Sequence, residues 1–321
     1  MSFKISGISG GKEEKHEIVI IGSGPAGLTA GIYAVRGGAD TILIGGYSFG
    51  GQLMLTTEVE NFPGFPEPIL GPELMKRMRA QAERLGVVII DKDATEINLT
   101  ERPFRITVEE DTYYADAVIL AMGASPRELG IPSEKKFKGR GVSYCAVCDG
   151  MFFKGMDVAV IGGGDTAIED AIYLSKICKS VTVIHRRDKL RAQAVLQKRA
   201  FSIPNINFVW NSEVVEIYGS QKVEGVKIKN KMTNEITSLQ VQGVFVDIGH
   251  IPNTSLVEGQ IELTENKYIK LFGETGTSIK GVFAAGDIAD PVYRQAITAA
   301  GMGAKAALDA LRYLQELKEK S

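Results

Sequence analysis

The sequence predicts an α/β protein made of two related units, one inserted into the other. A β-branched run, a glycine cluster and an apolar helical pattern follow one another twice, at 17–35 and at 157–177. Two further buried-strand patterns, at 117–121 and 244–248, each end in a small residue. We interpret these two strands as the crossings between the units, so that the second unit interrupts the first.

The length and charge of the chain argue against several classes of protein. The 321 residues, 44% hydrophobic and 24% charged, suffice for about two soluble globular domains. A net charge of −2 and a pI near 6.1 give no electrostatic reason to expect nucleic acid or an anionic membrane as a partner. No apolar run approaches the roughly 20 residues that span a bilayer.

The N-terminus and the cysteine content bear on the compartment. Residues 1–17 are polar and lack the apolar middle of a signal peptide, so we expect a loose arm before the first strand. Three cysteines are too few, and odd in number, for a disulfide-stapled secreted scaffold. We therefore expect a cytoplasmic protein, in which Cys178 is a small buried apolar residue.

The first glycine cluster, Gly22 to Gly27, indicates a Rossmann-type dinucleotide loop. It follows the strand 17–21 and opens a helix, and the strand 41–44 completes a βαβ unit. The first glycine allows the tight turn, the second lets a pyrophosphate approach, and the third permits close helix packing. The acid that usually binds the ribose is missing, because the second strand ends in Ile44-Gly45-Gly46. We therefore expect no nicotinamide cofactor of the usual kind here, and FAD remains possible.

The other patterns complete the two units. Apolar residues on one face predict a helix from 72 to 85, and short strands are expected at 87–90, 94–99, 104–108 and 113–114. Alternating residues predict an antiparallel meander of strands at 207–210, 213–218, 223–229 and 235–240. A buried strand ending in Gly286-Asp287 places a carboxylate at the carboxyl edge of a sheet, where α/β folds bind ligands. The last helix begins near Arg294, and its charged end, 315–321, is expected to fray.

Cys145 and Cys148, with Asp149 directly after them, form the candidate reactive centre. In a chain with this cysteine content a Cys-x-x-Cys pair indicates redox or metal chemistry. A zinc site would need two more ligands, and only Cys178 and three histidines remain in the sequence to supply them.

The second glycine cluster is followed by a basic loop. Gly162 to Ala167 again joins a strand to a helix, with alanine in the place of the third glycine. The next strand, 181–184, ends in His185, and Arg186, Arg187 and Arg191 stand where an NAD site would present an acid. Guanidinium groups match a 2′-phosphate in charge and geometry, so this loop predicts selection of NADPH over NADH.

Over nearly its whole length, from Ile18 to Leu314, the chain resembles the low-molecular-weight thioredoxin reductases of the bacterial and archaeal type. The motifs that carry the resemblance occur in the family's order: Gly22–Gly27, Gly50–Leu53, Glu58–Asn61, Cys145–Asp149, Gly162–Asp165, His185–Asp188, Gly286–Asp287 and Tyr293–Ala296. The resemblance implies a fold of two Rossmann-like domains of the three-layer ββα type, with the NADPH domain inserted into the FAD domain. The FAD domain would comprise residues 1–124 and 250–321, and the NADPH domain with its Cys pair would comprise 125–249.

The resemblance also assigns the binding residues. Those expected to hold FAD are Gly22, Gly24, Pro25, Ala26, Gly27, Gly45, Gly51, Gln52, Asn61, Gly286, Asp287, Arg294, Gln295 and Ala296. Those expected to hold NADPH are Gly162, Gly164, Asp165, Thr166, His185, Arg186, Arg187 and Arg191.

The implied activity is NADPH-dependent, FAD-mediated reduction of thioredoxin or a thioredoxin-like disulfide protein by a homodimer. In the family the cysteine matching Cys148 lies nearer the flavin, the one matching Cys145 attacks the partner, and the acid matching Asp149 handles the proton. The inserted domain is expected to rotate between half-reactions, with Gly123 and Gly249 as candidate hinges. The alternatives are a related flavin reductase that serves a glutaredoxin-like, peroxidase-system or ferredoxin partner, and a metal-binding module.

Overall fold

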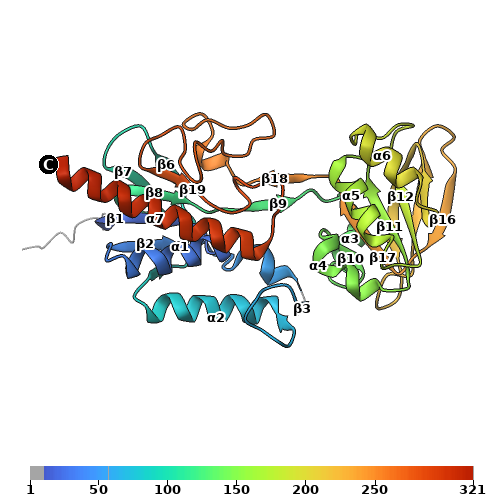
Figure 1. Ribbon diagram of the computed structural model, residues 1–321, viewed down its shortest axis with the longest axis horizontal. Coiled ribbons are helices and arrows are strands. Elements are labelled where there is room, and N and C mark those ends of the chain that lie inside the picture. The colour runs from blue at the N-terminus through green and yellow to red at the C-terminus, as the bar shows by residue number, and fades with distance from the viewer. Residues whose placement is uncertain (1–10, 57, 321) are drawn as a thin grey trace, which may run out of the picture. The chain divides into compact units, whose positions relative to one another are not determined.

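The computed structural model describes residues 11–56 and 58–320, and the chain in this part divides into two compact units. Unit 1 comprises Met1–Ser125 and Ile251–Ser321, and unit 2 comprises Pro126–His250 (Figure 1). Both units are mixed α/β, as predicted, and unit 2 interrupts unit 1 once. The chain passes between them through β9 (Ala124–Pro126) and β18 (His250–Pro252), which pair with each other.

Unit 1 is built on a seven-stranded sheet whose centre is parallel. The path of the sheet is β5-β2-β1-β8-β7-β6, and β19 also pairs with β8. Its strands are β1 (Glu13–Ile21), β2 (Thr41–Ile44), β5 (Val88–Ile90), β6 (Glu96–Asn98), β7 (Phe104–Val108), β8 (Asp111–Leu120) and β19 (Val282–Ala284). Residues 18–20 of β1 are completely buried, as expected for a central strand that is covered on both faces.

Three helices cover one face of this sheet and bury the larger part of its core. They are α1 (Pro25–Arg36), α2 (Gly71–Arg84), which confirms the helix predicted at 72–85, and α7 (Ala296–Lys320). A second core lies on the other face, and side chains of β6, of β7 and of the segment around η3 (Ser255–Val257) contribute to it. The short elements η1 (Gly51–Leu55), β3 (Glu58–Val59) and β4 (Ile69–Leu70) precede α2.

The first strand is longer than the sequence predicts. We expected it to begin at Glu17, but it begins at Glu13, because Glu13 to His16 pair in parallel register with Thr112 to Ala115 of β8. Because the side chains of this extension are polar, the sequence pattern did not indicate a strand there, and backbone hydrogen bonds define it. The rest of the expected arm, residues 1–10, lies outside the described residues.

Unit 2 consists of a five-stranded parallel sheet and a three-stranded antiparallel one. The parallel order is β10-β17-β11-β12-β13, with β10 (Val142–Ser143), β11 (Asp157–Gly162), β12 (Ser180–Ile184), β13 (Ile206–Val209) and β17 (Gly243–Asp247). The antiparallel meander consists of β14 (Ser212–Tyr218), β15 (Gly225–Asn230) and β16 (Ile236–Gln240). The helices are α3 (Pro132–Phe137), α4 (Ala146–Asp149), η2 (Gly150–Phe153), α5 (Asp165–Leu174) and α6 (Ala194–Phe201).

One strand belongs to a different sheet from the one predicted. We expected residues 207–210 to open the antiparallel meander, but β13 pairs in parallel with β12, from Val181 opposite Ile206 to Ile184 opposite Val209. Asn211, with a positive φ of 50°, turns the chain between β13 and β14. The meander therefore has three strands, because the turn at Asn211 separates β13, the first of the four predicted strands, from the other three.

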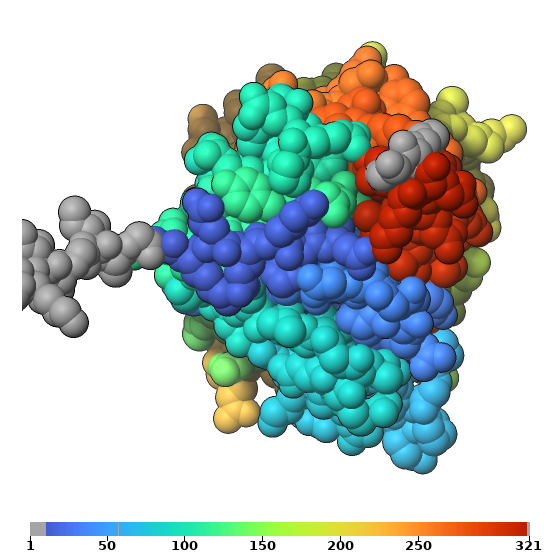
Figure 2. Space-filling model, turned by 90° about the vertical axis from the view of Figure 1, so that its left-hand side faces the viewer, coloured from blue at the N-terminus to red at the C-terminus, as the bar shows by residue number. Residues whose placement is uncertain are grey.

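The C-terminal end is also more ordered than expected. We predicted that residues 315–321 fray, but α7 continues to Lys320. Leu314 is buried, and Lys318 forms an ion pair of 2.7 Å with Glu17. Figure 2 shows this end of α7, in red, lying against the blue N-terminal part of unit 1.

The packing of α7 on α1 depends on a glycine. A Cβ placed on Gly303 would lie 2.1 Å from the carbonyl oxygen of Ala26, closer than real side chains approach a backbone atom. Around it α7 presents the buried small residues Ala299, Ala300, Ala306, Ala307 and Ala310. These small residues let α7 approach the start of α1, and thereby fix the position of the first glycine cluster.

The two glycines of α7 provide a matched test of this packing. Gly303→Ala should destabilise unit 1 by about 1–3 kcal/mol, because either α1 or α7 must shift. Gly301→Ala should be neutral or stabilising by up to about 1 kcal/mol, since a Cβ there meets nothing within 4 Å and alanine favours the helix. Urea unfolding of both variants measures the difference, and equal effects would contradict the close approach.

Candidate active site

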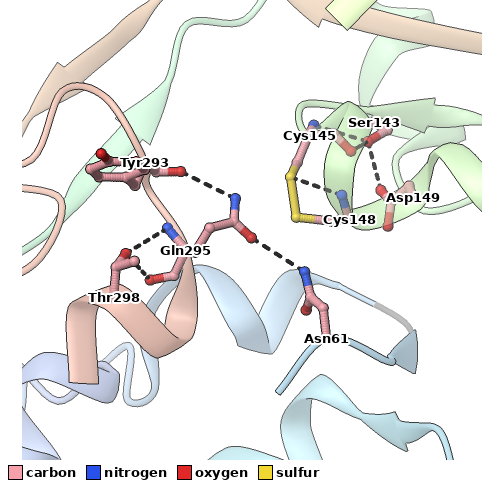
Figure 3. The surroundings of a disulfide bond; sticks show 8 residues. All are labelled: Asn61, Ser143, Cys145, Cys148, Asp149, Tyr293, Gln295 and Thr298. Atoms are coloured by element: carbon pink, nitrogen blue, oxygen red, sulfur yellow. Dashed lines mark hydrogen bonds between the residues drawn. A yellow bond between two sulfur atoms is a disulfide. The ribbon is translucent and has the colours of Figure 1, made fainter. Parts of the chain in front are cut away.

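The Cys pair lies in unit 2, at the start of the short helix α4. Cys145 precedes the helix, Cys148 lies within it, and the two sulfurs form a disulfide with a Cα–Cα distance of 5.3 Å. The Sγ of Cys145 also accepts a hydrogen bond of 3.2 Å from the backbone N–H of Cys148. Figure 3 shows the disulfide beside Ser143 and Asp149. A thiolate on Cys145 would keep an N–H donor directed at it, which favours the charged form.

Asp149 has a partly buried carboxyl with one close polar neighbour. Its Oδ2 accepts a hydrogen bond of 2.6 Å from the hydroxyl of Ser143, which is the last residue of β10 (Figure 3). Burial raises the pKa of Asp149 above its ordinary value, and the hydrogen bond from Ser143 lowers it in part. A carboxyl with a raised pKa gives and takes a proton closer to neutral pH than an exposed aspartate does.

In the second glycine cluster, neighbouring protein atoms fill the space beside two of the glycines, and the space beside the third is open. A Cβ on Gly162 would lie 2.4 Å from the carbonyl oxygen of Asp247, and one on Gly163 would lie 2.3 Å from Nδ1 of His185. A Cβ on Gly164 meets nothing within 4 Å. Gly164 is also the N-cap of α5, and no side chain caps the helix there. The open side of the loop thus faces the positive end of a helix, which suits a phosphate group.

The basic loop after β12 is fastened to this glycine cluster. The backbone N–H groups of Arg191 and Ala192 donate to the carbonyl of Gly163, at 2.7 and 3.1 Å. His185 is buried, and its Nε2 lies 3.1 Å from the carbonyl of Lys189, within the loop. Burial lowers the pKa of His185, so the ring is uncharged at neutral pH and supports the loop from inside.

The arginines of this loop have no acidic partners in the part of the chain that the structure describes. Arg186, Arg187 and Arg191 are exposed, and the ion pairs formed by the described residues include none of them. Three uncompensated guanidinium groups beside an uncapped helix start attract an anion with several negative oxygens.

Asp165 and Thr166, both predicted to bind the nucleotide, lie in the first turn of α5. Thr166 is half-buried. Oδ1 of Asp165 accepts a hydrogen bond of 2.7 Å from the N–H of Gln193, the N-cap of α6. The structure therefore assigns Asp165 a supporting contact, because its carboxylate ties α5 to the start of α6 just beyond the basic loop.

In unit 1 the first glycine cluster repeats this pattern. A Cβ on Gly22 would lie 2.2 Å from the carbonyl oxygen of Ala121, and one on Gly27 would lie 1.8 Å from that of Gly22. A Cβ on Gly24 meets nothing within 4 Å. Gly24 is the N-cap of α1, without a side-chain cap or an acid in the first turn, and Pro25 and Ala26 begin the helix. The backbone thus leaves open space at the second glycine, the position that a pyrophosphate approaches in this type of motif.

Ser23 connects this cluster to the loop from Gly45 to Gln52, and the sequence reasoning missed it. Its buried hydroxyl donates to the carbonyl of Gly45 at 2.6 Å and accepts from the N–H of Gly50 at 3.1 Å. Gly51 follows, and a Cβ there would lie 3.7 Å from the Cα of Gly24. The variable position of the glycine pattern carries no signal for this contact, because the partners are backbone atoms distant in sequence.

The C-terminal motif joins the same site from α7 and β19. A Cβ on Gly286 would lie 3.0 Å from the Cβ of Ala26, so Gly286 and Asp287 lie beside the start of α1. The side chain of Gln295, just before Ala296 at the start of α7, accepts a hydrogen bond of 3.2 Å from Nδ2 of Asn61 (Figure 3). Residues from three distant parts of unit 1 thus meet at the carboxyl edge of its sheet.

Asp290 is a second support that the sequence reasoning did not identify. Its buried carboxylate accepts hydrogen bonds from the N–H groups of Val292 and Tyr293, each at 2.9 Å, and of Arg294 at 3.2 Å. Arg294 has a positive φ of 50°, which a residue with a side chain rarely adopts. The carboxylate compensates for this conformation and sets the entry of the chain into α7.

Asp287 is held in an environment that disfavours its charge. Burial and the nearby charge of Asp290 raise its pKa from an ordinary value of 3.8 to about 6, and Arg294 opposes the shift. The ligand-free protein therefore carries a carboxyl whose ionisation costs free energy. Such a group is suited to accept hydrogen bonds from a bound ligand, which would relieve this cost.

The shift of Asp287 leads to a pH-dependent prediction. A raised native pKa means that Asp287 makes the ligand-free protein progressively less stable as pH rises from about 4 to about 6. This loss of stability is absent in Asp287→Asn. The free energy of unfolding of the variant should therefore exceed that of the wild type by about 1–3 kcal/mol at pH 7 and by little at pH 4. Urea unfolding of the flavin-free proteins at both pH values measures this gain, and a loss of stability at pH 7 would contradict it.

Comparisons with known proteins agree with this geometry. The family model for pyridine nucleotide-disulphide oxidoreductases matches residues 16–303. A thioredoxin reductase of Streptomyces coelicolor is 51% identical over 305 residues, which cover 94% of this chain and 95% of the relative. The solved thioredoxin reductase of Giardia duodenalis superposes with a TM-score of 0.90 at 44% identity, covering 94% of this chain and 99% of that one. That of Streptococcus pyogenes superposes with a TM-score of 0.89 at 42% identity and the same coverage.

The chain belongs to the pyridine nucleotide-disulphide oxidoreductase family and, within it, to the low-molecular-weight thioredoxin reductases. It is therefore an enzyme of the oxidoreductase class, and the family to which it belongs uses FAD and NADPH. Among the described residues, none of the helices is both long and apolar enough to cross a membrane.

Proposed function

We propose that the protein uses NADPH to reduce the disulfide of thioredoxin or a thioredoxin-like protein, with the Cys145–Cys148 disulfide as the electron carrier. The observation that carries this proposal is the disulfide itself, formed within the inserted unit and followed directly by Asp149, a carboxyl with a raised pKa. The overall reaction is NADPH + H⁺ + thioredoxin disulfide → NADP⁺ + thioredoxin dithiol. The names of the relatives support thioredoxin as the partner.

The proposal assigns FAD to unit 1 and NADPH to unit 2. Unit 1 fits FAD, since its glycine cluster is open at Gly24 and Asp287 gains from a hydrogen-bonding ligand. Unit 2 fits NADPH, since its cluster is open at Gly164 and the loop fastened to it carries three arginines without an acidic partner among the described residues. When bound, FAD supplies the two-electron relay between the nicotinamide and the disulfide.

The dithiol steps depend on residues of the chain itself. The thiolate of Cys145 attacks one sulfur of the partner's disulfide, which forms a mixed disulfide and releases a partner thiolate. The thiolate of Cys148 then attacks the Sγ of Cys145, which restores the Cys145–Cys148 disulfide and releases the second partner thiolate. Asp149 exchanges protons with these sulfurs.

The proposal includes motion of the two units and a homodimeric, cytoplasmic protein. Rotation would let the nicotinamide and the Cys pair use the flavin in turn, and the glycines next to the crossings have the backbone freedom for it. Gly123 has a φ of 68° and Gly249 one of 104°, both in the region that glycine favours. The homodimer rests on the resemblance to the family, and the compartment rests on the small and odd number of cysteines.

The proposed function is tested by following NADPH oxidation with one acceptor at a time. The acceptors are thioredoxin, a glutaredoxin-like protein, a peroxidase system and ferredoxin, and the flavin absorbance of the purified protein is recorded first. We expect a flavin spectrum and turnover with thioredoxin. A protein with a flavin spectrum that turns over only another acceptor would favour the related reductases.

The arginines give a test of nucleotide selection. Removing both in Arg186→Ala/Arg187→Ala should raise KM for NADPH by about ten- to hundredfold, because charged hydrogen bonds to the 2′-phosphate are lost. KM for NADH and for thioredoxin should change little. Lys189→Ala, which removes an exposed charge from the same loop, is the matched control. Equal increases for NADPH and thioredoxin would contradict the assignment.

The two cysteines are distinguished by trapping. Thioredoxin that keeps a single active-site cysteine, activated beforehand as a mixed disulfide with thionitrobenzoate, should form a stable mixed disulfide with the enzyme and release thionitrobenzoate. This reaction should be faster with Cys148→Ser, which keeps Cys145, than with Cys145→Ser. Both variants should retain reduction of the flavin by NADPH and lose thioredoxin reduction. Faster trapping by Cys145→Ser would exchange the roles of the two sulfurs. Non-reducing electrophoresis and mass spectrometry measure the product.

A further inference from the structure

The hydroxyl of Ser143 has three polar neighbours that belong to the reactive centre. It lies 2.6 Å from Oδ2 of Asp149 and 3.3 Å from the carbonyl oxygen of Cys145, and it accepts the N–H of Cys145 at 3.1 Å (Figure 3). Ser143 is buried and fixed by β10, which pairs in parallel with β17. No sequence motif indicates a role for Ser143.

The hydroxyl has only one proton for two acceptors. A serine oxygen donates one hydrogen bond and accepts up to two, and the N–H of Cys145 already occupies one acceptor position. When Asp149 is ionised, the proton of Ser143 points to the carboxylate, which is the closer and charged acceptor. When Asp149 is protonated, its own O–H can donate to the free acceptor position of Ser143, and the serine proton can turn to the carbonyl of Cys145.

We propose that Ser143 is a positioning residue for the dithiol reaction, whose hydroxyl holds the Asp149 carboxyl in the same place in both of its protonation states. The inference deepens the proposed function and rests on it for the role of Asp149. The proton transfer served by this arrangement is Asp149–COOH + Cys–S⁻ → Asp149–COO⁻ + Cys–SH, and its reverse. A carboxyl that stays in place needs no rearrangement between giving and taking the proton.

Few other groups compete with Ser143 for control of Asp149. Among the described elements, η2 and α5 make the most extensive contacts with α4. The titratable residues on α5 are Asp165, Glu169, Asp170 and Tyr173, and among the described residues burial and the Ser143 hydrogen bond are the causes that shift the pKa of Asp149. The two cysteines titrate only when reduced. The oxidised protein therefore isolates the effect of Ser143 on Asp149.

The direct test is a carboxyl titration of the oxidised protein by difference infrared spectroscopy, with Asp149→Asn identifying the band. In Ser143→Ala the Asp149 band should titrate at higher pH than in the wild type, because the one contact that lowers its pKa is lost. Ser143→Thr, which keeps the hydroxyl, should restore the wild-type titration. Ser180→Ala is the matched control, since Ser180 donates a hydrogen bond of 2.7 Å to Asp157 elsewhere in unit 2.

The kinetic test is the pH profile of thioredoxin reduction. One limb of this profile should reflect the titration of Asp149 and be absent in Asp149→Asn. In Ser143→Ala this limb should move to higher pH. Flavin reduction by NADPH should be unchanged. Adding Ser143→Ala to Asp149→Asn should change the rate far less than it does in the wild type, a coupling of about fivefold or more. This cycle also decides the question if the extra methyl of Ser143→Thr prevents folding.

The outcomes separate this inference from the proposed function. An unshifted Asp149 band in Ser143→Ala, or a uniform loss of rate at every pH, would overturn the role of Ser143. Lack of turnover with any disulfide acceptor would overturn the proposed function, whereas the infrared titration needs no acceptor and decides Ser143 alone.

Discussion

The close approach of backbone to backbone at the carboxyl edges of the two sheets is the constraint on which both sites depend. At Gly22 in unit 1 and Gly162 in unit 2 a carbonyl oxygen occupies the space that a Cβ would need, at 2.2 and 2.4 Å. Each helix can therefore start directly above its strand, with free N–H groups at an open glycine. The same principle recurs where α7 meets α1 at Gly303.

The two glycine clusters share this backbone geometry but differ in the charges around them. In unit 2 the neighbouring loop carries three arginines without acidic partners in the described chain, and a buried neutral histidine supports it. In unit 1 the neighbouring group is Asp287, a carboxyl whose pKa is raised to about 6. Two glycine loops with the same backbone geometry are thus surrounded by different charges, which come from side chains outside the glycine motifs.

Short polar side chains hold the loops that carry the site. Ser23 joins Gly45 to Gly50, Asp165 binds the N–H of Gln193, and Asp290 accepts three N–H groups ahead of α7. Ser143 occupies the corresponding place at the Cys pair. Each uses one or two atoms to fix backbone that regular hydrogen bonding leaves free, which keeps the site residues in defined positions.

Features that depend on local pattern could be predicted from the amino-acid sequence. The two strand–glycine–helix units, the helix α2, the Cys pair with its acid and the basic loop could all be predicted, because spacing and residue type specify each of them. The extended start of β1, the placement of β13 and the ordered end of α7 could not. They are set by pairing with β8 and β12 and by the contact of Lys318 with Glu17. Only the tertiary structure showed that Ser23, Asp290 and Ser143 support the site, because their partners are backbone atoms or residues whose proximity no sequence spacing encodes.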